Sequence, residues 1–135
     1  ILSRLVGSEM CIRDSNDFFP IAEKNNIGII LAGIFNSGIL AKGVGENITY
    51  FYDKIPEEVK QRYLKIANIC KKYDVPVPAA AIQFCYTNKL VTSMILGMDR
   101  LDQVEQNLEF LNFPIPEDLW KDLLNEKLID ERCPI

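Results

Sequence analysis

The chain contains no histidine among its 135 residues. Histidine is the commonest general base near neutral pH, and it is a frequent ligand of zinc and of haem iron. The four cysteines, at positions 11, 70, 85 and 133, form no CxxC pair. We therefore predict that the chain holds no metal. Any catalytic acid or base must be a different group, or must come from outside this sequence.

The sequence is also poor in positive charge, with 15 Lys and Arg against 19 Asp and Glu, and no basic stripe is visible. This balance argues against nucleic acid and anionic membranes as partners. No apolar run approaches the roughly 20 residues of a membrane-spanning helix. Because scattered thiols are typical of a reducing compartment, we expect a cytoplasmic protein.

Residues 1–15, "ILSRLVGSEMCIRDS", show neither the helical period nor strand alternation. Back-translation of residues 5–15 resembles the transposase adaptors used in sequencing libraries, in a single reading frame. We therefore predict that residues 1–15 are a non-native, adaptor-derived segment, which has to be excluded from the fold. The natural sequence is then expected to begin near Asn16 and to be a fragment, with residues 16–135 as its one structural unit.

The short apolar run of residues 27–34 suits a strand that is buried on both faces, as in parallel sheets covered by helices, and residues 90–97 are predicted to form a second strand. Helical patterns end near residue 25 and occupy residues 56–73, 78–88, 99–111 and 114–128, whereas residues 34–55 are expected to form a long connection. Two strands do not make a stable sheet, so we predict that others lie upstream. The fold class is α/β, specifically the C-terminal portion of a (β/α)8 TIM barrel with parallel strands and a C-terminal helix.

Three stretches resemble one family. "GIILAGIFNSGILAKG" is similar to the seventh strand and following loop of the aldo-keto reductases, and "AAAIQFCYTNKLVTSMILGM" is similar to their short helix and eighth strand. "GMDRLDQVEQNLEFL" resembles the loop and helix that hold the adenosine end of their cofactor. The pattern "GIFNSGIL" and the ending "NFPIPEDLWKDLLNEKLID" are closest to the aldose dehydrogenases of the L-galactose, L-fucose and D-threo-aldose 1-dehydrogenase type. The resemblance covers residues 16–135.

The resemblance implies that Phe35, Asn36 and Ser37 contact the cofactor pyrophosphate. Loops after strands 7 and 8 of such barrels often bind phosphate, because backbone N–H groups and a hydroxyl can donate to it. The alternative is an ordinary glycine turn in which Asn36 bonds its own backbone.

The resemblance further places Gly97, Met98, Asp99 and Arg100 at the adenosine ribose, and Gln106 and Asn107 at the adenine edge. An amide offers the donor and the acceptor that adenine requires. The alternative is a surface helix with polar residues facing water. Asp99 is expected to be its N-cap, with Asp102 as part of a capping box.

NADP-using members carry Lys or Arg at the positions of Gly97 and Gln103, whereas a carboxylate such as Asp99 suits a free ribose hydroxyl. We therefore expect NAD as the cofactor, with NADP possible. The family's catalytic Tyr, Lys, Asp and His lie on earlier strands, so no catalytic residue is assigned here.

The predicted function is part of an oxidoreductase that oxidises a small-molecule aldose at C1 to a lactone. The alternatives are a non-catalytic, cofactor-binding regulatory relative, or another (β/α)8 enzyme with a phosphate-bearing substrate. The oligomeric state is not predicted.

Overall fold

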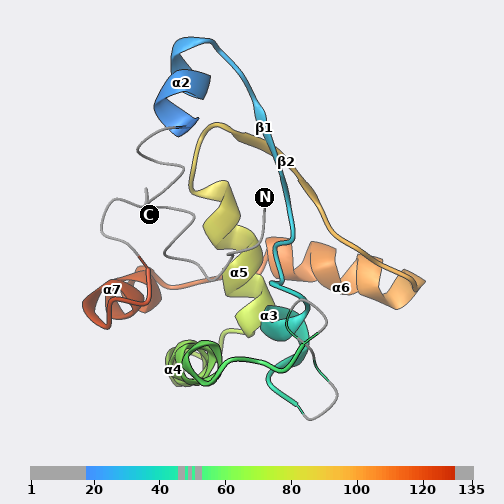
Figure 1. Ribbon diagram of the computed structural model, residues 1–135, viewed down its shortest axis with the longest axis vertical. Helices are drawn as coiled ribbons and strands as arrows, with labels where there is room; N and C mark the ends of the chain where they lie inside the picture. Colours follow the sequence, from blue (N-terminus) through green and yellow to red (C-terminus); the bar gives the residue numbers. More distant parts are fainter. Residues whose placement is uncertain (1–17, 46–47, 49, 51–52, 130–135) are drawn as a thin grey trace.

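The computed structural model describes residues 18–45, 48, 50 and 53–129 (Figure 1). The segment 1–15 that the sequence assigns to an adaptor lies outside the described residues, as does Cys133. Within the described part, strands β1 (Ile29–Ala32) and β2 (Val91–Ile95) pair in parallel, with Leu31 opposite Met94. The predicted parallel pairing is therefore confirmed, and each strand is shorter than its apolar run.

The prediction that the first strand is buried on both faces is wrong for the described chain. Ile30 is 62% exposed and Ile95 is 60% exposed, although Ile29 and Val91 at the beginning of the strands are buried. In the described part the sheet has only these two strands, so each of them has one open edge. An apolar run suits a strand that other strands and helices cover. The sequence of the run does not determine whether those covering elements are present.

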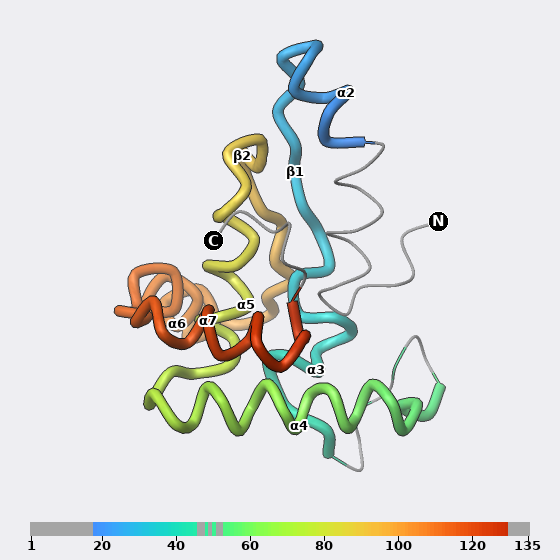
Figure 2. Tube along the Cα trace, turned by 90° about the vertical axis from the view of Figure 1, so that its left-hand side faces the viewer, coloured from blue at the N-terminus to red at the C-terminus, as the bar shows by residue number. Residues whose placement is uncertain are grey.

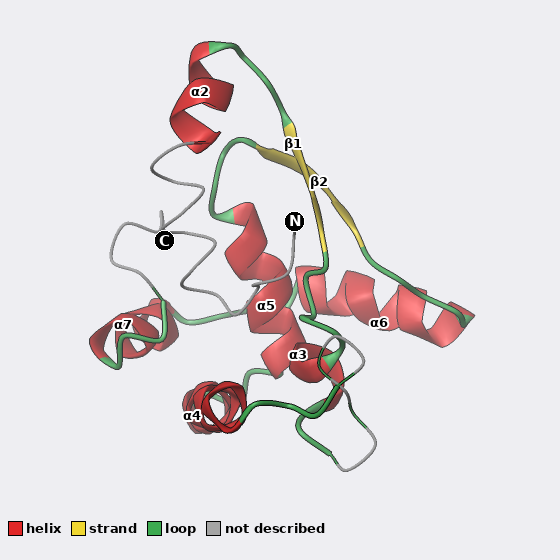
Figure 3. Cartoon of the chain, in the orientation of Figure 1, coloured by secondary structure: helices red, strands yellow, loops and turns green. Residues whose placement is uncertain are grey.

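The described residues contain six helices in addition to the strands, and the strand pair lies along one side of them, uncovered on its outer side (Figure 3). In chain order they are α2 (Phe19–Lys24), α3 (Ile39–Lys42), α4 (Glu57–Lys72), α5 (Val77–Tyr86), α6 (Leu101–Leu111) and α7 (Glu117–Asn125). The long connection predicted for residues 34–55 contains α3, a single turn that the sequence pattern did not indicate. None of the described helices is long and apolar enough to cross a bilayer.

The hydrophobic core lies between α4, α5 and α7, which gather on one side of the strands (Figure 2). Small residues of α5, Ala79 and Ala80, are buried against Cys70 of α4 and Leu119 of α7. The alanines allow the helices to approach closely, as interior packing at near-crystalline density requires. This core fixes α5, and α5 in turn supports α6, because the Gln83 side chain donates hydrogen bonds to backbone carbonyls near the end of α6.

Helices α2, α4 and α7 end in the same way. The residue after the C-cap has positive φ, at 53° in Asn26, 54° in Asp74 and 54° in Lys127. In α7, Lys127 N–H donates to the Leu124 carbonyl and Leu128 N–H donates to the Leu123 carbonyl, both at 2.9 Å. These paired bonds define a Schellman motif, which satisfies the last carbonyls of a helix. The chain therefore turns sharply after each of these helices.

The start of α6 differs from the prediction. The N-cap position is Arg100 and not Asp99, and no side chain caps the helix. Instead, the backbone N–H of Asp99 donates to Oε1 of Gln103 at 2.8 Å, so Gln103 takes the bridging role predicted for Asp102. The Asp102 carboxylate is instead hydrogen-bonded to the Arg100 guanidinium.

Candidate functional site

A pocket of about 680 Å³ lies where β1 and β2 end. Its lining comes mainly from two segments, the turn that follows β1 and the segment that follows β2 and continues into α6. All ten residues that the sequence singled out line this one pocket: Phe35, Asn36, Ser37, Gly97, Met98, Asp99, Arg100, Gln103, Gln106 and Asn107. The carboxyl ends of parallel strands meet at one edge of a sheet, which is why segments some sixty residues apart converge here.

The turn after β1 has an unusual backbone. Asn36, Ser37 and Gly38 follow one another with φ of 47°, 58° and 89°. Consecutive left-handed residues are uncommon, and each non-glycine residue in this region costs about 1–2 kcal/mol. The turn is closed by a 2.9 Å hydrogen bond from the Asn36 N–H to the Gly33 carbonyl. Strain of this kind is concentrated at functional sites.

Asn36 is the one buried polar residue among those described, with only 4% of its surface exposed. Its Oδ1 atom has no hydrogen-bond partner within the described part of the chain. The alternative of an Asn36 oxygen bonded to its own backbone is therefore not what the structure has. An unsatisfied buried polar atom costs about 1–3 kcal/mol, and a ligand in the pocket could remove that cost.

The segment after β2 is more open. Gly97, Met98, Asp99, Arg100 and Gln106 are exposed, whereas Gln103 and Asn107 are half-buried. This is the polar, solvent-facing helix start that the alternative interpretation describes, but it also faces the pocket. No side chain at the N-cap position caps α6, and the Asp102 carboxylate accepts hydrogen bonds from the backbone N–H groups of Asp102 and Gln103 in its first turn.

The charges at this end of the pocket are paired. Arg100 forms two parallel hydrogen bonds with Asp102, from Nε to Oδ1 at 2.9 Å and from NH2 to Oδ2 at 3.0 Å. The hydrogen bonds from Arg100 lower the pKa of the Asp102 carboxyl, and the same pairing raises the pKa of the guanidinium. Both groups are therefore charged at neutral pH.

Several pocket residues were missed by sequence reasoning. They are Gly33, Ile34, Ala41, Lys42, Pro78, Ile95, Leu96 and Phe110. Lys42 matters most, because it brings a positive charge to the pocket from α3. A helix period in "GILAK" could have indicated that Lys42 lies one turn beyond Gly38, on the same side as the turn after β1.

The pocket lining offers contacts for binding, and it contains no cysteine among the described residues. Neither Cys70 nor Cys85 lines the pocket, and burial raises the pKa of each thiol to about 11. A neutral, buried thiol is a poor nucleophile. The backbone N–H groups of the turn after β1 and Lys42 suit a negatively charged group, whereas the unpaired Oδ1 of Asn36 is an acceptor and suits a hydroxyl or N–H donor.

Comparison with protein families bears on the kind of ligand. The model of the aldo/keto reductase family matches residues 6–125, and the chain belongs to this family. It is a family of oxidoreductases that in general use NAD(P).

Two curated relatives support the membership. The chain is 40% identical over 116 residues to D-threo-aldose 1-dehydrogenase of a Pseudomonas species, and these residues are 85% of the chain and 35% of that protein. It is 36% identical over 113 residues to pyridoxal 4-dehydrogenase of Microbacterium luteolum, with 84% and 33% covered. The chain thus spans about a third of the length of the curated relatives it matches.

Solved structures bear on the fold. The holo form of an aldo-keto reductase from Bacillus halodurans has a TM-score of 0.64 at 20% identity, covering 87% of this chain and 39% of that one. Its apo form has a TM-score of 0.65 at 18% identity, covering 93% and 41%. The chain is therefore an α/β fragment that matches part of the (β/α)8 fold of this family.

Proposed function

We propose that residues 16–135 form the C-terminal, cofactor-binding part of an aldose 1-dehydrogenase that uses NAD. The observation that carries this proposal is the convergence of all ten candidate residues on one pocket at the carboxyl ends of β1 and β2. When bound, nicotinamide accepts a hydride, and in this enzyme the hydride would come from C1 of an aldose, leaving a lactone.

The turn after β1 is proposed to bind the diphosphate. Its left-handed residues expose the backbone, Ser37 offers a hydroxyl, and Lys42 supplies a positive charge from the next helix. Oδ1 of Asn36 lacks a partner and can only accept a hydrogen bond, so it fits a hydroxyl of the ribose rather than the diphosphate itself. These features are the chemistry that a diphosphate or the ribose beside it requires.

The segment after β2 is proposed to hold the adenosine, with Gln106 and Asn107 as hydrogen-bonding amides. Gly97 bears on the choice of cofactor. A Cβ added at Gly97 would meet no atom within 4 Å, so packing does not require glycine there. A lysine side chain could be accommodated at position 97, yet the chain has glycine there. The absence of lysine, together with Asp99, supports NAD over NADP.

A second candidate substrate comes from the Microbacterium luteolum relative, whose name specifies pyridoxal. The residues of this chain do not separate an aldose from pyridoxal, because the proposed pocket binds the cofactor. Both substrates would deliver a hydride to the same nicotinamide.

The test is an assay of the intact enzyme that carries residues 16–135, following NADH formation with L-galactose, L-fucose, other aldoses and pyridoxal. We expect aldose-dependent NADH formation, and we expect residues 16–135 alone to be inactive because they lack the family's acid–base residues. Gly97→Lys should increase kcat/KM for NADP by about tenfold, the value of one charge-assisted bond. Activity with pyridoxal and with no aldose would favour the second candidate. A lack of dehydrogenase activity, with the nucleotide bound, would favour a regulatory role.

A further inference from the structure

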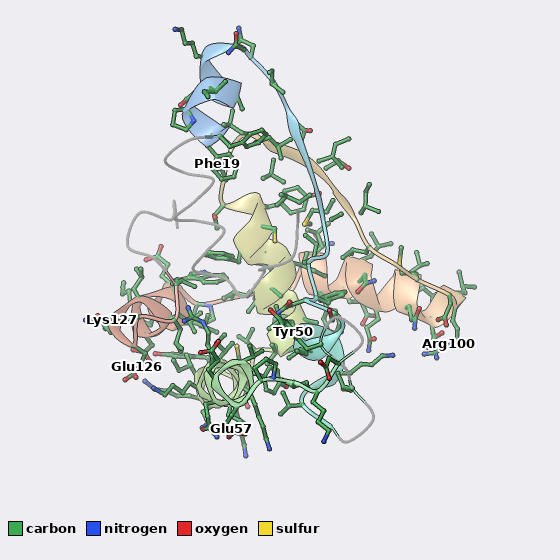
Figure 4. All side chains as sticks on the ribbon, in the orientation of Figure 1. Phe19, Tyr50, Glu57, Arg100, Glu126 and Lys127 are labelled. Atoms are coloured by element: carbon green, nitrogen blue, oxygen red, sulfur yellow. The ribbon has the colours of Figure 1, made fainter. Side chains whose placement is uncertain are left out.

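Arg100 lies at the beginning of α6, at the outer end of that helix (Figure 4). Its guanidinium is held by both carboxylate oxygens of Asp102, two residues further along, at 2.9 and 3.0 Å. Arg100 lines the pocket and Asp102 does not. The carboxylate therefore pairs with the arginine from the side that is outside the lining.

Two cationic residues line the pocket among the described residues. Lys42 belongs to α3, and Arg100 belongs to the segment that follows β2. A 2′-phosphate on the adenosine ribose would need such a cation once water is displaced. Asp102 already occupies two donors of the Arg100 fork, and Asp99 places a second carboxylate beside it. Arg100, the one arginine in the lining that the described residues form, is thus engaged by a competing anion.

We propose that Asp102 is a positioning residue that sets cofactor specificity: by holding the Arg100 fork, it prevents the arginine from binding a 2′-phosphate and so favours NAD over NADP. The inference rests on the proposed binding of a nicotinamide dinucleotide in this pocket. Asp102 does not line the pocket, so it would act on the cofactor only through Arg100.

The expected effect of Asp102 on cofactor preference is small, because the Arg100–Asp102 pair is exposed to solvent. The side chains of Arg100 and Asp102 are 64% and 66% exposed, and ion pairs at such positions are weak because solvent screens them. A phosphate could therefore displace Asp102 at some cost. We expect removal of the carboxylate charge to improve the relative affinity for a 2′-phosphate about fivefold, less than for a buried pair.

The experiment compares two probes that differ only in the phosphate of interest, adenosine 5′-monophosphate and adenosine 2′,5′-bisphosphate. Their dissociation constants are measured by NMR titration of the chain, with the Arg100 Nε–H resonance as a local readout. The variants are Asp102→Asn, Asp102→Glu, and Asp102→Asn combined with Arg100→Gln. In Asp102→Asn we expect the bisphosphate to gain about fivefold over the monophosphate and to shift the Arg100 resonance.

Asp102→Glu keeps the charge and should behave as the unmodified chain, and the double variant should lose the gain because its arginine is absent. An unchanged ratio in Asp102→Asn, or a gain that persists without Arg100, would overturn the inference while leaving nucleotide binding intact. Failure of both probes to bind any folded variant would instead contradict the proposed function, and this inference with it.

Discussion

Oε1 of Gln103 accepts a 2.8 Å hydrogen bond from the backbone N–H of Asp99. The bond joins the segment after β2 to the first turn of α6, so it fixes the pocket residues on both sides of the helix start. Gln103→Met, which keeps the length of the side chain and removes the acceptor, should lower the free energy of unfolding by about 0.5–1 kcal/mol. Urea unfolding measures this.

The matched control is Gln106→Met. Gln106 lies one turn further along the same helix, is exposed, and its side chain makes no hydrogen bond among the described residues. Its substitution should leave the urea midpoint unchanged. Equal losses in the two variants would show that the Gln103 bond contributes nothing of its own.

Asp122 should make stability depend on pH. Its carboxylate accepts hydrogen bonds at 2.7 Å from Lys72 and Tyr73, which join α7 to α4 and lower its pKa. The stabilisation is present above the ordinary aspartate pKa of about 3.9 and is lost as the pH falls through the lowered value. Asp122→Asn should therefore lower the urea midpoint at pH 7, with a difference that shrinks from about pH 5 downwards.

Asp118→Asn provides the comparison, because Asp118 pairs with Lys121 inside α7 and joins no second element. We expect a smaller change in the midpoint at pH 7. If the two variants lose the same stability at pH 7 and pH 3, the contact between the helices is not the cause.

Lys127 adopts φ of 54° immediately after the end of α7, where glycine is the usual residue (Figure 4). Lys127→Gly should raise the free energy of unfolding by about 1 kcal/mol, because a left-handed lysine is strained. Lys127→Ala retains the Cβ and should bring no such gain. Thermal unfolding of the two variants separates the backbone effect from the loss of charge, and a similar gain in both would attribute it to charge.

The periodic elements could be predicted from the sequence, because α4, α6 and α7 carry apolar stripes and α4 and α7 are bounded by proline. The parallel pairing of β1 with β2 also followed from alternating strands and helices. The exposure of Ile30 and Ile95 could not be predicted, because burial depends on which other elements are present, and an apolar run does not specify them.

In the candidate site, residue types and order were sufficient to bring Phe35–Ser37 and Gly97–Asn107 together in one pocket. Residue types and order were not sufficient to predict the local geometry of the site. Asp99 was expected to cap α6, but its backbone is bonded by Gln103, and the Arg100–Asp102 pair depends on side-chain rotamers. The left-handed Asn36 and Ser37 were also unforeseen, because neither residue requires positive φ.

Residues 1–15 are proposed to contribute nothing to the fold. The match to the family model begins at residue 6, whereas back-translation places the native start near Asn16, so the two disagree over residues 6–15. Deletion of residues 1–15 should leave the circular dichroism spectrum and the melting temperature unchanged. A clear loss of stability would assign residues 6–15 to the native protein.

The central claim is that the turn after β1 and the start of α6 bind a nicotinamide dinucleotide. The most direct measurement is the dissociation constant of NAD, by calorimetry or ligand-observed NMR, for the unmodified chain, Asn36→Gly and Asn26→Gly. Both substitutions replace an asparagine of similar positive φ, at 47° and 53°, so glycine suits each backbone, but only Asn36 lines the pocket. The account predicts that NAD binds, that Asn36→Gly weakens binding about tenfold through loss of the amide, and that Asn26→Gly does not. A folded chain that binds no NAD at millimolar concentration, or equal affinities in the two variants, would contradict it.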